Sequence, residues 1–139
     1  MPKWVIICIG VFLSCSGLHA QKQCTEADAK KAEVEASSLK TWAEVYSSYL
    51  RYAQCDDGAI GEGYSSTVAR LLADDWSQFG KLKLLMSDKS FAKFVLRHID
   101  QLMSTEQEKA IRESASKRCP PGATTACKSV LSRLNQTAP

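Results

Sequence analysis

Few residues of this chain could take part in catalysis, and they are widely spaced. His98 is the only histidine after the first twenty residues. A serine or cysteine nucleophile needs a histidine base within hydrogen-bonding reach, oriented in turn by an acid. Asp100 and the pair at 74–75 would meet His98 only by coincidence. Because His98 falls on an apolar helical stripe, we expect a hydrogen-bonded packing role for it rather than catalysis.

Two pairs of neighbouring carboxylates, at 56–57 and 74–75, do not suggest glycosidase chemistry. Adjacent residues diverge by about 100° around a helix, so the members of each pair do not face one another. We therefore predict no enzymatic activity and no cofactor.

The most distinctive segment, 55–64, is rich in aspartate and glycine. It fails as a calcium loop, because Thr67 stands where a bidentate glutamate is required. Its glycine spacing matches no phosphate-binding loop, and no strand precedes it. We expect the aspartates to cap a helix whose small residues, Gly58, Gly61 and Ser65, let another backbone approach closely.

Four cysteines remain after the first twenty residues, with spacings of 31, 64 and 8: Cys24, Cys55, Cys119 and Cys127. Structural zinc sites usually pair cysteines two residues apart and add histidines, so a metal site is not favoured. An even number of cysteines in an exported chain predicts two disulfides. Three connectivities are open.

The first twenty residues have the features of an export signal. Lys3 precedes an apolar run at 4–13, and a small-residue exit ends at Ala20. About ten apolar residues are too few to cross a bilayer. Lipid attachment through Cys15 is less favoured, because Phe12 stands where a bacterial lipobox usually has leucine. We expect secretion across the inner membrane into the periplasm, with residues 21–139 forming a single domain.

The mature chain carries 17 basic and 15 acidic residues, a formal charge of +2. Both signs are interleaved along the sequence. This near balance argues against binding to nucleic acid and against an electrostatic membrane surface binder.

Helical periodicity runs through almost the whole mature chain, and no alternating strand pattern is visible. We expect an all-α, up-and-down bundle of about five to six disulfide-linked helices. Capping boxes are indicated at Thr25 and at Thr105, a further cap at Asp88, and a bend near Gly80. The expected helices lie at about 25–54, 58–78, 79–86, 89–102, 106–118 and 125–134.

The length of the first helix restricts the disulfides. A continuous helix between Cys24 and Cys55 would span about 45 Å, whereas a disulfide joins Cα atoms about 5.5 Å apart. This excludes that bond unless the helix folds back near 37–38. Cys55, Cys119 and Cys127 should gather at one end of the bundle, and we favour a bond within this group, which leaves the partner of Cys24 open.

Six tyrosine and tryptophan residues between 42 and 76 form a concentrated aromatic set. Most should pack in the core. Tyr52 lies away from the main apolar stripe, so we consider it a candidate anchor for a partner protein.

A small exported helical chain with two expected disulfides and no catalytic constellation resembles the periplasmic immunity proteins that neutralise peptidoglycan-cleaving effectors of type VI secretion. In character it is similar to the Tai4-type amidase immunity family, through residues 39–55, 56–76 and 91–102. That resemblance implies an all-helical, typically dimeric protein that occludes the amidase active site with a loop or helix end. Position alone suggests two protruding loops, with the candidate partner-binding residues Ser87, Asp88, Lys89, Gly122 and Thr124.

Two other classes remain open. The chain could be a general cell-envelope binding or structural module with an unknown partner. It could also be an enzyme built on Asp56, Asp57, Glu62 and His98.

Overall fold

A computed structural model describes residues 22–137. The predicted signal peptide and the lipid-attachment alternative at Cys15 lie outside these residues. The described chain is all-helical, as predicted, and two short 3-10 turns accompany the helices: η1 (Ala53–Cys55) and η2 (Trp76–Gln78). The α-helices are seven rather than five to six: α1 (Glu26–Ala36), α2 (Trp42–Tyr52), α3 (Gly58–Asp74), α4 (Phe79–Leu85), α5 (Lys89–Arg97), α6 (Thr105–Lys117) and α7 (Thr124–Thr137).

The additional helix arises because the first expected helix is broken at residues 37–41. Thr41 caps α2 in a full capping box, in which its hydroxyl accepts from the Glu44 amide at 3.2 Å. The Glu44 carboxylate in turn accepts from the Thr41 amide at 3.2 Å. These bonds satisfy amides that a continuous helix would have used internally, so α2 begins anew and α1 and α2 pack against each other.

This fold-back decides the first disulfide. Cys24 and Cys55 are bonded, with Cα atoms 4.9 Å apart. The expectation that one long helix would keep Cys24 and Cys55 apart was wrong. The chain instead folds back near 37–38, which was the one condition under which this bond remained possible. The second disulfide joins Cys119 and Cys127 across the α6–α7 connection. The favoured bond within the group of Cys55, Cys119 and Cys127 is therefore found, between Cys119 and Cys127, whereas Cys55 pairs outside this group.

The two disulfides indicate an oxidising compartment outside the cytoplasm. No helix within residues 22–137 is long and apolar enough to cross a membrane.

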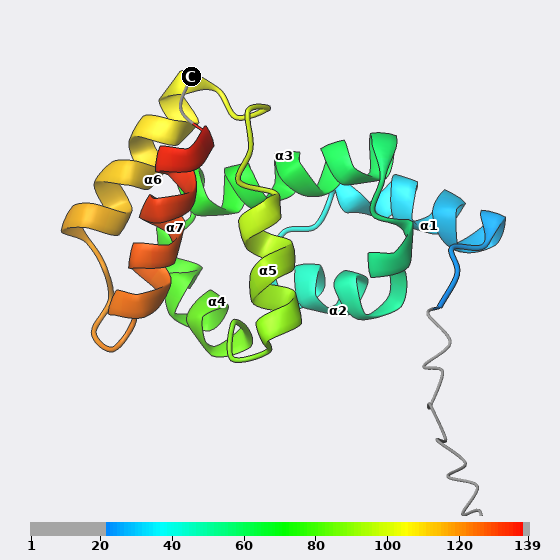
Figure 1. Ribbon diagram of the computed structural model, residues 1–139, viewed down its shortest axis with the longest axis horizontal. Helices are drawn as coiled ribbons and strands as arrows, with labels where there is room; N and C mark the ends of the chain where they lie inside the picture. Colours follow the sequence, from blue (N-terminus) through cyan, green and yellow to red (C-terminus); the bar gives the residue numbers. More distant parts are fainter. Residues whose placement is uncertain (1–21, 138–139) are drawn as a thin grey trace, which may run out of the picture.

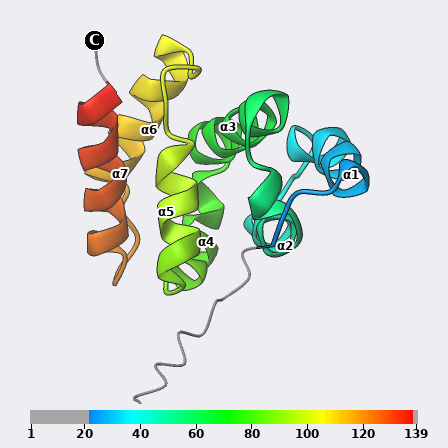
Figure 2. The ribbon, with the colours of Figure 1, turned by 45° about the vertical axis from the view of Figure 1, so that its right-hand side comes forward.

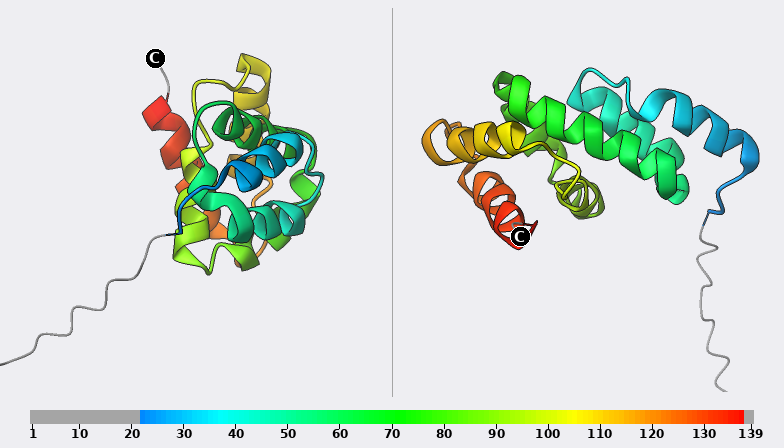
Figure 3. Two further views of the ribbon diagram at one scale, coloured as in Figure 1. Left: turned by 90° about the vertical axis from the view of Figure 1, so that its right-hand side faces the viewer. Right: turned by 90° about the horizontal axis from the view of Figure 1, so that it is seen from above.

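The long helix α3 organises the molecule. α1 packs along one part of α3, and α6 packs along another. Figure 3 shows α5 and α7 projecting from the same side of the layer that α3 and α6 form. α5 runs across α3 in Figure 1 instead of alongside it, so the arrangement is not the simple up-and-down order that we expected.

α5 contributes the aromatic centre of the core. Phe91 and Phe94 are buried and pack edge-on against Tyr46 and Tyr64, with ring centroids 4.8 and 5.0 Å apart respectively. The opposite face of α5 is polar, and Lys93 is exposed on it. Because one face of α5 is apolar and the other polar, the rotation of α5 about its axis is fixed, and so are the side chains that it presents to solvent.

A close approach of another backbone to α3 was predicted at Gly58, Gly61 and Ser65, but it occurs at Gly63, which was not among them. A Cβ atom placed there would lie 2.9 Å from the Ala36 Cβ, at the end of α1. Gly58 instead allows the positive φ of +50° at the start of α3, just after Asp57, which caps this helix as predicted.

Other local predictions shift by a few residues. Ser104, not Thr105, caps α6 in a capping box with Gln107. The bend expected near Gly80 lies at Asp75, before η2, and Gly80 is inside α4. Hydrogen bonds from Ser77 and then Gln78 lower the pKa of Asp75, because they stabilise its ionised form.

Candidate functional site

A buried polar network surrounds His98, the residue that follows α5. Its Nδ1 lies 2.9 Å from Ser65 Oγ of α3, and its Nε2 lies 3.0 Å from Asp56 Oδ2. Ser65 donates its own hydroxyl proton to Asp100 Oδ2 at 2.5 Å. Arg97 forms an ion pair with Asp56 from the surface side. The structure thus brings a serine, a histidine and two aspartates together from three separate segments.

The sequence analysis anticipated only part of this network. It expected His98 to be a hydrogen-bonded packing residue, and His98 is 4% exposed and hydrogen-bonded at both ring nitrogens. It regarded Asp100 as a chance neighbour of His98, but the two are linked through Ser65. Asp56 was grouped with His98 only in the enzyme alternative, and no contact between the two was predicted, because no local pattern relates residues 42 positions apart.

The network contains the residue types of a catalytic triad, but a substrate could not reach its serine. Ser65 is 3% exposed, and neither it nor His98 or Asp56 lines any of three main surface hollows of the described chain. The Ser65 proton is directed to Asp100, away from the imidazole that would have to remove it. We interpret the network as a tie that holds α3, the end of α5 and the α2–α3 connection together.

Tyr64, next to Ser65, extends this buried polar layer. Its hydroxyl lies 2.7 Å from Ser48 Oγ, and its ring packs beside His98 with centroids 5.7 Å apart. Burial raises the pKa of Tyr64. No buried side-chain nitrogen or oxygen in the described residues lacks a hydrogen-bond partner, so the layer is complete without a bound ligand. Nor do these residues contain a cluster of three or more histidine, cysteine or acidic side chains suited to a metal ion.

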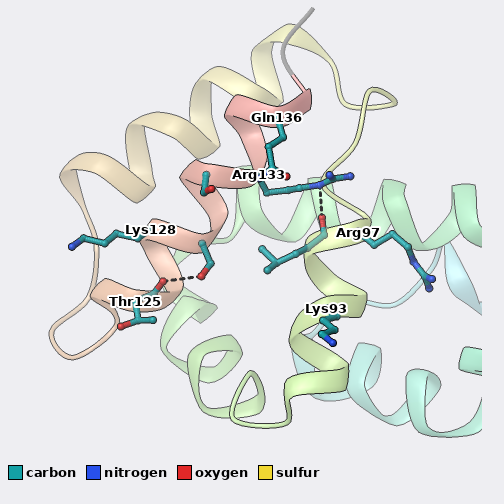
Figure 4. A pocket seen from close by; sticks show the side chains of 9 residues that line it. Lys93, Arg97, Thr125, Lys128, Arg133 and Gln136 are labelled. Atoms are coloured by element: carbon teal, nitrogen blue, oxygen red, sulfur yellow. Dashed lines mark hydrogen bonds between the residues drawn. The ribbon is translucent and has the colours of Figure 1, made fainter.

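A large hollow lies on the surface between α5 and α7 and has a volume of about 660 Å³. Figure 4 looks into it, with Lys93 at the front of α5 and Lys128 extending from α7 away from α5. We call it the α5–α7 groove. Its lining residues are Lys93, Leu96, Arg97, Thr125, Lys128, Ser129, Ser132, Arg133 and Gln136.

A second hollow of about 450 Å³ continues the groove toward α4 and shares four of its lining residues. It adds Lys83 from α4, Ser87 from the α4–α5 turn, Lys89 from the start of α5, and Gly122 from the α6–α7 loop. Three of the residues predicted to bind a partner, Ser87, Lys89 and Gly122, are therefore brought together at this end of the groove.

The other predicted partner-binding residues are placed differently. Thr124 is exposed at the start of α7. The Asp88 carboxylate caps α5 by accepting from the Ser90 amide at 2.9 Å and also accepts from the Tyr46 hydroxyl at 3.2 Å. Burial and this bond to Asp88 raise the pKa of Tyr46. Tyr52 is 8% exposed, so we do not include it in the proposed surface.

The groove is strongly basic. Its two sections are lined by six lysine and arginine side chains and, among the residues described, by no carboxylate. Four of the six make no ion pair or side-chain hydrogen bond within residues 22–137: Lys83, Lys89, Lys93 and Lys128. Arg133 is engaged, because its Nε donates to the carbonyls of Leu96 and Ile99, both at 3.0 Å, and so ties α7 to the end of α5.

The near-neutral net charge of the whole chain does not reveal this local positive charge. Residues 22–78 contain six basic and ten acidic residues, whereas 79–99 and 119–137 together contain seven basic residues and one acidic residue. Because the charges were taken as interleaved along the sequence, the basic groove was not predicted. Counting charge by segment would have found the basic segments, but not that α5 and α7 lie side by side (Figure 2).

Comparisons with known proteins identify no relatives. No family model matches the chain, and neither a curated protein nor a solved structure matches it. The function is therefore argued from the groove, the buried network and the disulfides.

Proposed function

We propose that this protein is a periplasmic inhibitor that binds a partner protein, acting as an immunity protein that occludes the active site of a peptidoglycan-cleaving amidase effector. The observation that carries the binding function is the α5–α7 groove, an open concave surface whose lysines lack partners within the described chain. The groups with catalytic potential are instead buried and hydrogen-bonded to one another. The amidase as partner is supported by the family resemblance.

The loop between α6 and α7 suits an occluding role. The Cys119–Cys127 disulfide closes it, and Gly122 adopts a φ of +72° within it. A loop constrained in this way loses little conformational freedom when it enters a cleft, so more of the contact energy appears as affinity. Inhibition would then require no chemistry from the inhibitor, only exclusion of the substrate.

A direct test combines the oxidised protein with the secreted amidase encoded beside it. We expect the protein to form a stable complex, to abolish cleavage of purified peptidoglycan at a stoichiometric ratio, and to restore the growth of cells that export the amidase. A variant with Gly122→Trp should inhibit less, because a bulky side chain alters the loop without entering the core. Full peptidoglycan cleavage in the presence of excess protein would refute the immunity function.

In an alternative function, the same basic groove binds a partner other than an amidase. A general envelope binding or structural module would use the same basic groove on another anionic envelope component. Recovery of a cell-wall amidase in a periplasmic pull-down supports the inhibitor, whereas recovery of envelope polymer without any amidase supports the module. The homodimer implied by the resemblance is tested in the same preparation by light scattering.

A further inference from the structure

We propose that the α5–α7 groove and its continuation toward α4 bind an acidic, amphipathic helical segment of the partner protein. This inference rests on the proposed partner-binding function and names the chemistry of the partner's segment.

Charge complementarity is the first argument. Lys93 belongs to α5 and Lys128 to α7, the two helices that border the groove, and Lys83 and Lys89 line its continuation. None of the four has an ion-pair partner among the described residues, although 15 acidic residues are present in the mature chain. Acidic side chains along the edges of a bound segment would supply those partners and would also speed association.

The floor of the groove is apolar, which argues for a segment with an apolar face. The half-buried side chain of Leu96 lines both sections of the groove, and the buried or half-buried Met86, Ala92 and Ala126 line the section toward α4. An amphipathic helix places apolar side chains on such a floor and its charged flanks on the edges.

Other anionic ligands fit less well. Single-stranded nucleic acid binds by stacking its bases on aromatic rings, and no aromatic side chain is among the groove-lining residues described. A membrane surface is broad, whereas the lysines here surround a concavity. A free phosphate would need convergent donors, and the four lysines are spread along the whole groove.

The framework around the groove is held at both ends, and α7 sets its length. α7 packs on α6, and Arg133 bridges to the end of α5 at one end of the groove. The Cys119–Cys127 disulfide holds the loop at the other end. α7 has 14 residues, so a segment of about 20 Å, roughly four helical turns, would match it.

The test uses the full oxidised chain and fluorescently labelled synthetic helices of about 14 residues. One peptide has leucine on one face and glutamate on both flanks, and its matched control has lysine in place of every glutamate. We expect the acidic peptide to bind at least about tenfold more tightly than the basic one and to weaken as salt is raised, as measured by fluorescence anisotropy.

Matched variants locate the binding. The pair Lys93→Glu and Lys128→Glu should weaken acidic-peptide binding by at least about tenfold. The control pair Lys31→Glu and Lys109→Glu changes the net charge equally at exposed positions outside the groove and should leave affinity within about twofold. Equal thermal stability of both double variants confirms that each is folded.

Three results would overturn the inference: equal binding of the two peptides, equal loss in both double variants, or tighter binding of phosphatidylglycerol vesicles or single-stranded DNA than of the acidic peptide. Salt-sensitive self-association that the groove variant abolishes would overturn it too, because a second copy would then occupy the groove. The peptide assay needs no amidase. Peptide binding without amidase inhibition would refute only the immunity function, and inhibition without peptide binding would refute only this inference.

Discussion

Ser65 shows how the type of a residue can mislead about its role. It lies beside a histidine that is in turn beside an aspartate, yet its hydroxyl is buried and donates to a second aspartate. In a hydrolase, such groups can activate a nucleophile. Here each of them forms a hydrogen bond with another member of the network. Burial makes such a network valuable to the fold, because a polar group left without its partner is costly in the interior.

We therefore expect Ser65→Ala to destabilise the protein by about 1–3 kcal/mol, because both His98 and Asp100 lose a buried hydrogen-bond partner. Urea denaturation followed by circular dichroism measures the change. Ser116→Ala, at an exposed position on α6, is the control and should stay within about 0.5 kcal/mol. An unchanged stability for Ser65→Ala would show that the network does not hold the segments together.

At the scale of helices, close helix–helix contacts depend on the positions of glycine, which has no side chain. The α1–α3 contact requires glycine at position 63, where a methyl group would meet Ala36 and the backbone nitrogen of Ser37. The pattern of small residues was visible in the sequence, but the position of close approach depends on where α1 ends. That end is set by the capping box at Thr41 and Glu44, which the sequence also contains and the analysis overlooked.

Gly63→Ala should consequently lower the free energy of unfolding by about 1–3 kcal/mol, since the crowded backbone can yield only by moving α1 away from α3. Gly80→Ala is the matched control, because it is helical and has no atom within 4 Å of the added Cβ. It should stabilise the protein by about 0.4–1 kcal/mol through the lower entropy of the unfolded chain. Thermal denaturation of both variants measures the two effects, and equal shifts would contradict the packing argument.

Across the whole molecule, the two disulfides restrain different parts. Cys24–Cys55 joins the start of α1 to the end of η1, whereas Cys119–Cys127 closes the short α6–α7 loop. The basic groove lies on the side of the second disulfide, and most of the acidic excess belongs to the α1–α3 half. Structural stability and partner binding should therefore respond differently to the loss of each bond.

Removing the first disulfide, by Cys24→Ser with Cys55→Ser, should cost more stability than removing the second, by Cys119→Ser with Cys127→Ser. The sequence separations are 31 and 8, and chain-entropy arguments assign the longer loop about 1 kcal/mol more. Equilibrium denaturation of both variants tests the order. Partner inhibition should fall more in the second variant, because its loop is released, and the reverse pattern would argue against that loop as the occluding element.

The sequence by itself determined the helical class, because its apolar residues recur with helical spacing, and it determined several helix starts, because caps act within one turn. Thr25, Asp57 and Asp88 cap helices where they were expected to. Only the tertiary structure decided the Cys24–Cys55 pairing, the meeting of Asp56 with His98 and the basic groove between α5 and α7. Each of these joins residues more than 30 positions apart, and their proximity depends on how α1 folds back and how α5 crosses α3. Local sequence patterns do not determine the angles at which these helices pack, because the packing of the entire core fixes them.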